Sequence, residues 1–223
     1  MLNVFSIFES IDGEVNSFGQ GACTIFIRLA GCNLRCTYGG SGCDTKMAQL
    51  SQSGTKMENA DVIQKVFEYK SNKVTITGGE PLLQMGELSL VLDTLRAQNY
   101  KITLETNGTI NPQPIIHLVD SLIMDCKIGH ELNSEYFRCL LNRTCDWIKF
   151  VVWDMNSFLK ACTHKEYLEK YCCPDSRFAF SPVTSQLSPK KLLEWIFKYV
   201  DNLSNTSLNV QLHKLIDLKE DQI

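Results

Sequence analysis

Short apolar runs rich in β-branched and aromatic residues recur along the chain and predict strands. Residues 208–212 form a weaker run of the same kind. The six clear runs are residues 24–29, 74–77, 101–105, 121–125, 147–152 and 178–181. Runs of this length are typical of strands in globular proteins.

Between these runs, apolar residues recur three and four positions apart, which predicts amphipathic helices. Asn59 is positioned to cap the first helix, and Ser188 followed by Pro189 opens the third. The predicted buried faces are Val62, Ile63, Val66 and Phe67, then Leu88, Val91, Leu92 and Leu95, and finally Leu192, Leu193, Ile196 and Phe197.

Alternating strands and helices favour an α/β fold with a mostly parallel sheet and right-handed crossovers. Sites in such sheets gather at the carboxyl ends of the strands. Four unusual sequences follow four successive predicted strands: a cysteine-rich loop, then residues 78–81, 106–108 and 126–127. The sequence therefore predicts one domain over residues 1–223, with a site at this edge of the sheet.

Composition narrows the function classes. The formal net charge is -3 and Lys and Arg form no continuous run, so nucleic acid is not an expected direct partner. No apolar stretch approaches the roughly 20 residues that span a bilayer, and residues 1–9 lack the features of a signal peptide. Ten unevenly spaced cysteines without an export signal favour a reducing compartment. We therefore expect a cytoplasmic protein that does not bind membranes.

Three of the cysteines, Cys32, Cys36 and Cys43, lie close together in a glycine-rich loop. Structural zinc sites use four protein ligands, and only a distant residue such as His130 could complete one here. A [4Fe-4S] cluster on three thiolates leaves one iron open to an exogenous ligand. The loop alone favours an iron–sulfur cluster, while a zinc site and unligated thiols remain as alternatives.

Residues 26–36 and 43–45, which surround these cysteines, resemble the radical S-adenosylmethionine superfamily. Six motifs in order, spread over residues 10–214, resemble one family within it, the 7-carboxy-7-deazaguanine synthases. These motifs are Ser10-Ile11-Asp12-Gly13-Glu14, the strand that contains Arg28, Cys43-Asp44-Thr45-Lys46, Thr77-Gly78-Gly79-Glu80-Pro81, Glu105-Thr106-Asn107-Gly108-Thr109 and Gln211-Leu212-His213-Lys214. Any one motif has little weight, but six in order are highly specific.

The resemblance implies an abbreviated, incomplete (β/α) barrel of the radical SAM type, with about six parallel strands, and a homodimer. It implies a lyase that converts 6-carboxy-5,6,7,8-tetrahydropterin to 7-carboxy-7-deazaguanine with loss of ammonia, in queuosine-type 7-deazapurine biosynthesis. The implied cofactors are a [4Fe-4S] cluster, S-adenosylmethionine and Mg²⁺, with flavodoxin or ferredoxin as electron donor. The alternatives are another radical enzyme, such as a glycyl-radical activase, and a non-catalytic protein that binds an iron–sulfur cluster or zinc.

The resemblance also implies roles for individual residues. Cys32, Cys36 and Cys43 hold the cluster, and Thr45 binds Mg²⁺. The residues expected at S-adenosylmethionine are Gly42, Cys43, Asp44, Gly79, Asp125, Cys126 and Lys127. The residues expected at the pterin are Ile11, Asp12, Gly13, Arg28, Thr77, Gln211 and His213. Independently, Arg28 interrupts an apolar strand, and its planar guanidinium matches a carboxylate bidentately.

One feature departs from the family pattern. Six residues separate Cys36 from Cys43, whereas the family usually has two between its second and third cysteines. Gly42 takes the place of an aromatic residue, and Tyr38 is displaced. The glycines in this segment predict a loop that bulges outward while Cys43 still reaches the cluster.

Overall fold

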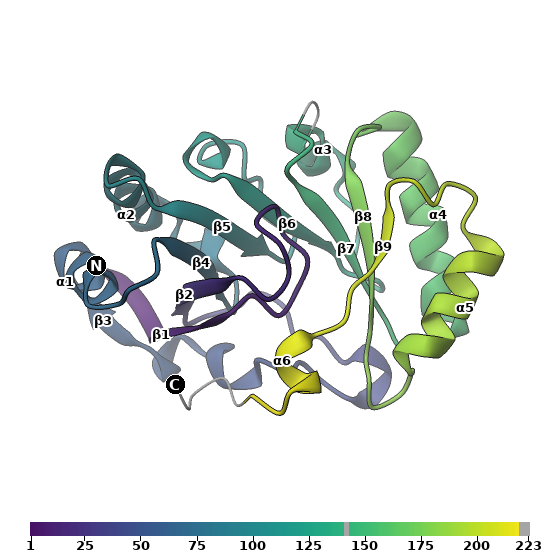
Figure 1. Cartoon of the computed structure of the whole chain (residues 1–223), viewed down its shortest axis with the longest axis horizontal. Helices are drawn as coiled ribbons and strands as arrows, with labels where there is room; N and C mark the ends of the chain where they lie inside the picture. The colour runs from purple at the N-terminus through teal and green to yellow at the C-terminus, as the bar shows by residue number, and fades with distance from the viewer. Residues whose placement is uncertain (141–142, 219–223) are drawn as a thin grey trace.

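A computed structural model describes residues 1–140 and 143–218 and contains a nine-stranded sheet in the order β3-β1-β2-β4-β5-β6-β7-β8-β9. The strands are β1 (Leu2–Ile11), β2 (Cys23–Leu29), β3 (Thr55–Met57), β4 (Lys73–Gly78), β5 (Lys101–Thr106), β6 (Ser121–Cys126), β7 (Trp147–Val152), β8 (Arg177–Pro182) and β9 (Thr206–Leu208). From β2 through β4 to β9 neighbouring strands are parallel, whereas β1 pairs antiparallel with β2 and β3. The curved sheet stays open between β3 and β9, so the barrel is incomplete (Figure 1).

Helices α1, α2, α4 and α5 lie along the outside of this curve (Figure 1). The helices are α1 (Asn59–Phe67), α2 (Met85–Ala97), α3 (Ser134–Phe137), α4 (Met155–Tyr171), α5 (Pro189–Tyr199) and α6 (Leu212–Leu215). Short 3-10 turns are η1 (Tyr38–Gly40), η2 (Lys46–Ala48), η3 (Ser51–Ser53), η4 (Pro81–Gln84), η5 (Ile116–Leu118) and η6 (Arg138–Leu140). Within residues 1–140 and 143–218, no helix has the length and apolar character to cross a membrane.

All six clear strand predictions are confirmed, but β1, β3 and α4 were not predicted. A register shift between Val4 and Ser6 interrupts the alternation of β1, which weakens its strand pattern. Helix α4 buries polar side chains such as Ser157 and Lys165, so its apolar periodicity is faint. The predicted strand over 208–212 is wrong in position, because β9 ends at Leu208 and α6 begins at Leu212.

The predicted helix faces are confirmed in part. All four predicted residues of α2 are buried, but Phe67 in α1 and Phe197 in α5 are 48% and 66% exposed. In α5, Trp195 packs against Phe158 instead, with ring centroids 5.6 Å apart. Ser188 caps α5 as predicted, whereas the cap of α1 is Glu58 and not Asn59.

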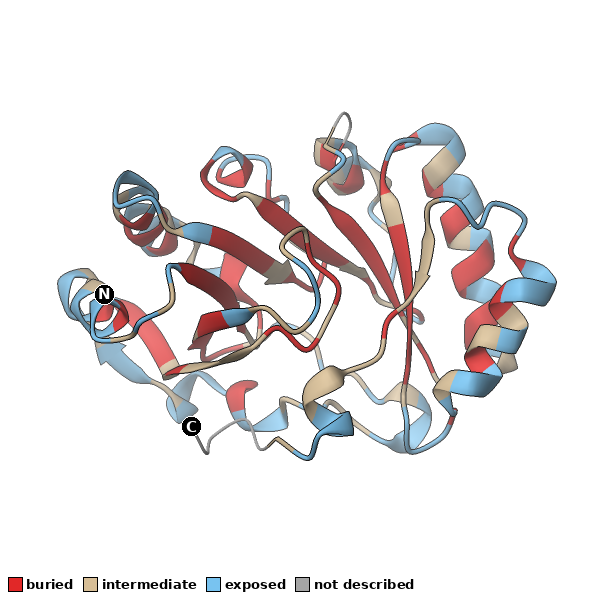
Figure 2. Cartoon of the chain, viewed as in Figure 1, coloured by how far each residue is buried: buried red, intermediate tan, exposed pale blue. Residues whose placement is uncertain are grey.

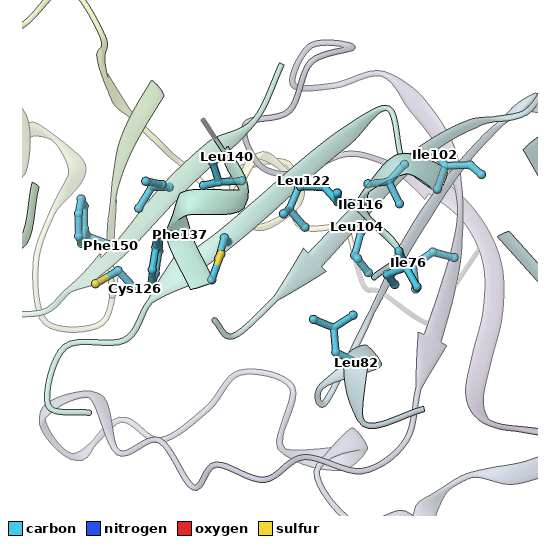
Figure 3. Packing of buried hydrophobic residues seen from close by; sticks show 14 of the residues in the cluster. Ile76, Leu82, Ile102, Leu104, Ile116, Leu122, Cys126, Phe137, Leu140 and Phe150 are labelled. Atoms are coloured by element: carbon cyan, nitrogen blue, oxygen red, sulfur yellow. The ribbon is translucent and has the colours of Figure 1, made fainter. Parts of the chain in front are cut away.

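Successive side chains of each parallel strand point to opposite faces of the sheet. Outward side chains pack against the helices, as Figure 3 shows for Ile76, Leu104, Leu122 and Phe150, and this layer is buried throughout (Figure 2). The side chains one position away point to the inner face. Those that line a cavity there are Arg28, Thr77, Glu105, Asp125, Lys149 and Ser181.

The segment between β1 and β2 fills the inner face where the strands begin. Val15 forms a small buried cluster with Ile123, Trp147 and Ala179. The amide of Ser17 donates to the hydroxyl of Ser121 at the start of β6, at 3.2 Å. The inner face is therefore packed at the beginning of the strands and hollow toward their carboxyl ends.

Candidate active site

A cavity of about 380 Å³ lies against the inner face and the carboxyl ends of the strands. Its volume falls within the range of roughly 300 to 1,000 Å³ that is usual for small-molecule sites. Its walls include residues from the cysteine loop, from the segments after β4, β5 and β6, from the 10–14 motif and from the C-terminal motif. The prediction that these segments meet at one edge of the sheet is confirmed.

Cys32, Cys36 and Cys43 all line the cavity as free, partly buried thiols. The amide of Leu34 lies 3.4 Å from Sγ of Cys32, and Nδ2 of Asn107 lies 3.8 Å from it. Such donors stabilise a thiolate that binds a metal centre. Three thiols on one loop with amide donors beside them fit a [4Fe-4S] cluster that keeps one open iron.

The described residues do not assemble the zinc site that the sequence left as an alternative. Among residues 1–140 and 143–218, no group of three or more His, Cys, Asp and Glu side chains is arranged to hold one metal ion. His130, the distant residue considered as a zinc ligand, is exposed and lies outside the lining of the cavity.

The Gly78-Gly79 turn joins the end of β4 to the base of the cysteine loop. The Gly79 amide donates to the carbonyl of Leu29 at 3.0 Å. A Cβ on Gly78 would lie 2.1 Å from that carbonyl oxygen, and one on Gly79 would lie 2.2 Å from the carbonyl oxygen of Gly31. Gly78 also has a φ of 140°, which disfavours any side chain. The glycines therefore allow the backbone contact that holds the loop in place.

Buried Glu80 ties the same turn to the end of β5. Its carboxylate accepts from the amides of Leu82 and Asn107 at 2.9 and 2.6 Å, and from the Thr106 hydroxyl at 2.8 Å. Burial raises the pKa of Glu80, while these hydrogen bonds act in the opposite direction. Glu80 is thus a structural residue of the Gly-Gly-Glu-Pro motif.

Arg28 extends from the inner face of β2 and is 5% exposed. Its guanidinium carbon lies 5.9 Å from the centroid of the Phe8 ring, which stacks on Phe26. Thr77 is its register partner on β4, and the Thr77 hydroxyl donates to Glu105 at 2.7 Å. Burial and the nearby Glu14 raise the pKa of Glu105 to about 7.

Two lysines and two carboxylates cross the centre of the inner face. Lys149 pairs with Glu14 and lies 3.2 Å from Oδ1 of Asp125, whose other oxygen pairs with Lys127. Burial opposes the charge of both lysines, but the carboxylates raise their pKa values, so both stay protonated. Lys127 also donates to the Tyr38 hydroxyl at 2.8 Å.

The C-terminal motif closes the side of the cavity next to residues 10–14. Nε2 of Gln211 lies 3.1 Å from Glu14 and 3.0 Å from Asp44, and Lys214 pairs with Asp44 at 2.9 Å. The His213 ring packs on Gly13, where an added Cβ would lie 2.0 Å from Nδ1. The first and last motifs of the sequence are therefore in contact.

Comparisons with known proteins agree with this geometry. The family model described as a 4Fe-4S single cluster domain matches residues 17–138, more than half of the chain. The chain is 31% identical to the 7-carboxy-7-deazaguanine synthase of Hyperthermus butylicus, over 98% of this chain and 94% of the relative. The chain belongs to the 7-carboxy-7-deazaguanine synthase family.

Other members of the family match as completely. The 7-carboxy-7-deazaguanine synthase of Clostridium acetobutylicum is 32% identical over 94% of this chain and 93% of its own. The synthase of Chlorobaculum tepidum is 33% identical over 96% and 94%. The crystal structure of QueE from Escherichia coli shares the fold, with a TM-score of 0.68 at 20% identity and coverage of 94% and 93%.

Most residues expected from the 7-carboxy-7-deazaguanine synthase resemblance line the cavity. They are Ile11, Gly13, Arg28, Cys32, Cys36, Gly42, Cys43, Asp44, Thr45, Thr77, Gly79, Asp125, Lys127, Gln211 and His213. Two expected residues, Asp12 and Cys126, are not among the residues that line the cavity. Cys126 follows Asp125 on β6, so alternation turns it into the outer core. Asp12 is buried, pairs with Lys73 and accepts a hydrogen bond from Thr75 at 2.8 Å.

Lys149 was not expected at the site of a 7-carboxy-7-deazaguanine synthase, and the adjacent Glu14 and Glu105 were given no role. The signal for Lys149 was present, because it interrupts the apolar run of β7 as Arg28 interrupts β2. An isolated cation in a strand that is buried on both faces indicates a polar inner site.

Proposed function

We propose that this chain converts 6-carboxy-5,6,7,8-tetrahydropterin to 7-carboxy-7-deazaguanine with loss of ammonia, in 7-deazapurine biosynthesis of the queuosine type. The observation that carries the proposal is one cavity that joins a three-cysteine loop to buried Arg28 and to the Glu105 and Lys149 side chains. The names of the curated relatives support the same reaction. Residues 1–223 would act as one domain.

Cys32, Cys36 and Cys43 would hold the [4Fe-4S] cluster. S-adenosylmethionine would lie beside them, against Gly42, Gly79 and the inner side of Asp125 and Lys127. When bound, the cluster supplies the single electron that cleavage of S-adenosylmethionine requires. The backbone of Gly79 packs closely on Gly31, and the Lys127 and Asp125 side chains are 12% and 13% exposed, which would limit water on this side of the site.

Arg28 would clamp the pterin carboxylate, because a guanidinium can form two parallel hydrogen bonds to a carboxylate and Arg28 lines the cavity from a buried position. Thr77 is the register partner of Arg28 on the adjacent strand, and its hydroxyl donates a hydrogen bond to Glu105 at 2.7 Å. A carboxyl group with a pKa of about 7 can bind or release a proton near neutral pH, so Glu105 is suited to move a proton on the substrate. The main chain at Ile11 and Gly13, with Gln211 and His213, would enclose the heterocycle.

Thr45 would supply a hydroxyl oxygen to Mg²⁺, with substrate oxygens and water in the remaining positions. Its Oγ1 lies 3.4 Å from Sγ of Cys43, so an ion here would lie close to the cluster. Flavodoxin or ferredoxin would donate the electron, and the active form would be a homodimer. Ten free cysteines suit a reducing compartment such as the cytoplasm.

Mass spectrometry of an anaerobic reaction tests the proposal. The reaction contains reconstituted protein, a reductant, S-adenosylmethionine, Mg²⁺ and 6-carboxytetrahydropterin. We expect 7-carboxy-7-deazaguanine from the wild type and from Cys23→Ala, an exposed cysteine outside the cavity, but not from Cys43→Ala. Cleavage of S-adenosylmethionine without this product would refute the substrate, and absence of cleavage would refute the radical chemistry.

A further inference from the structure

In the lengthened segment between Cys36 and Cys43, residues 39–41 are exposed, in keeping with the predicted outward bulge, but the segment is also docked onto the protein. The Thr37 carbonyl accepts from the amides of Gly40 and Gly42, at 2.8 and 2.9 Å, which closes residues 37–42 into a compact turn. The segment that follows β8 contacts this turn through Ser185 and Gln186. Its Ser185 hydroxyl lies 2.9 Å from that of Ser41.

Gln186 holds this turn from outside the cavity. Its Nε2 donates to the carbonyl of Tyr38 at 2.6 Å and to the Ser41 hydroxyl at 2.5 Å. Gly39 fits beneath it, since a Cβ there would lie 2.5 Å from Cδ1 of Trp153 and 2.7 Å from Oε1 of Gln186. A side chain at Gly39 would require the Trp153 ring or the exposed Gln186 side chain to shift, and the φ of 65° also favours glycine at this position.

Tyr38 lines the cavity together with Ser41 and Gly42 of the same turn. Its φ of 42° is unusual for a residue other than glycine, so tertiary contacts hold it in place. Its ring lies 6.0 Å from that of Trp153, and the Lys127 ammonium lies 5.5 Å from its ring centroid. The Tyr38 hydroxyl accepts a hydrogen bond from that ammonium at 2.8 Å.

We propose that the lengthened loop is a fixed wall on the S-adenosylmethionine side of the cavity and that Tyr38 is a positioning residue for Lys127. An ammonium has three N–H donors. In the described part of the chain Asp125 and Tyr38 take two of them, which directs the third to the cavity that Lys127 lines. An oxygen of bound S-adenosylmethionine is the acceptor. This inference rests on the proposed function.

Tyr38 lies far from Arg28, the residue proposed to bind the pterin carboxylate. Tyr38 contacts Lys127 at the end of β6, whereas Arg28 is on β2, and β4 and β5 lie between these strands. Neighbouring strands are about 4.8 Å apart, so the two contacts are on the order of 14 Å from each other across the sheet. A change at Tyr38 should therefore affect S-adenosylmethionine and leave the pterin unaffected.

Two variants of the reconstituted holoenzyme test the inference. Tyr38→Phe removes only the hydroxyl, and Gln186→Ala releases the turn from a position outside the cavity lining. Gln98→Ala, an exposed glutamine at the end of α2, is the control. The readouts are the dissociation constant of S-adenosylhomocysteine by calorimetry, the separate KM values for S-adenosylmethionine and the pterin, and the iron content.

With Tyr38→Phe we expect about tenfold weaker S-adenosylhomocysteine binding and a matching rise in the KM for S-adenosylmethionine. The KM for the pterin and the iron content should stay at the wild-type values. Gln186→Ala should change the same two quantities in the same direction by a smaller factor, and Gln98→Ala should change neither. Wild-type binding by both variants, or a rise confined to the pterin KM, would overturn the inference while the proposed function stands. A wild-type enzyme that neither binds nor cleaves S-adenosylmethionine would overturn both.

Discussion

The ammonium of Lys149 on β7 lies 3.2 Å from Oδ1 of Asp125 on β6, and it also pairs with Glu14 from the segment after β1. Asp125 is the register partner of Lys149 in the β6–β7 pair, whereas Glu14 lies 135 positions before Lys149 in the sequence. One buried cation thus joins a neighbouring strand to a distant loop. Because Asp125 also pairs with Lys127, Lys149 belongs to a chain of ion pairs that runs from Glu14 to Lys127 along the cavity.

Lys149→Met should lower the free energy of unfolding by about 3 kcal/mol, since it removes the cation that pairs with largely buried Glu14 and leaves Asp125 with Lys127 alone. Urea unfolding measures the change. Lys190→Met, on the exposed side of α5, is the matched control and should stay within about 0.5 kcal/mol of the wild type. If both variants are equally stable, the ion pairs of Lys149 do not hold the inner face together.

Arg28→Lys should raise the KM for the carboxylated pterin about tenfold, because a lysine cannot form two parallel hydrogen bonds to the carboxylate. Steady-state kinetics with S-adenosylmethionine at saturation measure this. The dissociation constant of a tetrahydropterin that lacks the carboxylate should be the same in both proteins. Equal weakening of both pterins would mean that Arg28 shapes the pocket but does not bind the carboxylate.

Stability should depend on pH through Glu105, whose pKa burial and Glu14 raise from 4.5 to about 7. Between these values the folded protein holds a proton that the unfolded chain has released, so stability falls as pH rises through this interval. Glu105→Gln removes that contribution and keeps an acceptor for Thr77. Its free energy of unfolding should fall less than that of the wild type from pH 5 to pH 7, whereas parallel curves would refute the raised pKa.

Gly79→Ala should be destabilising by several kcal/mol, because the new Cβ would lie 2.2 Å from the Gly31 carbonyl oxygen in a backbone contact that cannot yield easily. Gly86→Ala in α2 is the matched control. Apart from its chain neighbours and its own helix backbone, no described atom lies within 4 Å of its Cβ position, so alanine should stabilise the helix by about 0.5 to 1 kcal/mol. Thermal unfolding compares the two, and a neutral Gly79→Ala would show that the turn can move away from the cysteine loop.

Much of the fold was predictable because its central elements follow local periodicity. The parallel strands β4 to β8 are short segments rich in apolar and β-branched residues, and α2 buries the four residues that its spacing indicated. Strand β1 and helix α4 were missed because a register shift and buried polar side chains weaken their patterns. Strand β1 is held by pairing with β2 and β3, and α4 packs on β7, and a local pattern does not contain these contacts.

The residue types and their spacing determined the chemistry: three cysteines in one loop, an arginine within an apolar strand, and four motifs at the carboxyl ends of four strands. Only the tertiary structure decided which side chains meet. It turned Cys126 outward and Asp125 inward, paired Asp12 with Lys73, brought Lys149 to Glu14, and docked Tyr38 onto Lys127. The physical reason is that strand order, register and the direction of each side chain are fixed by pairing between segments far apart in the chain, which the sequence encodes only through the whole fold.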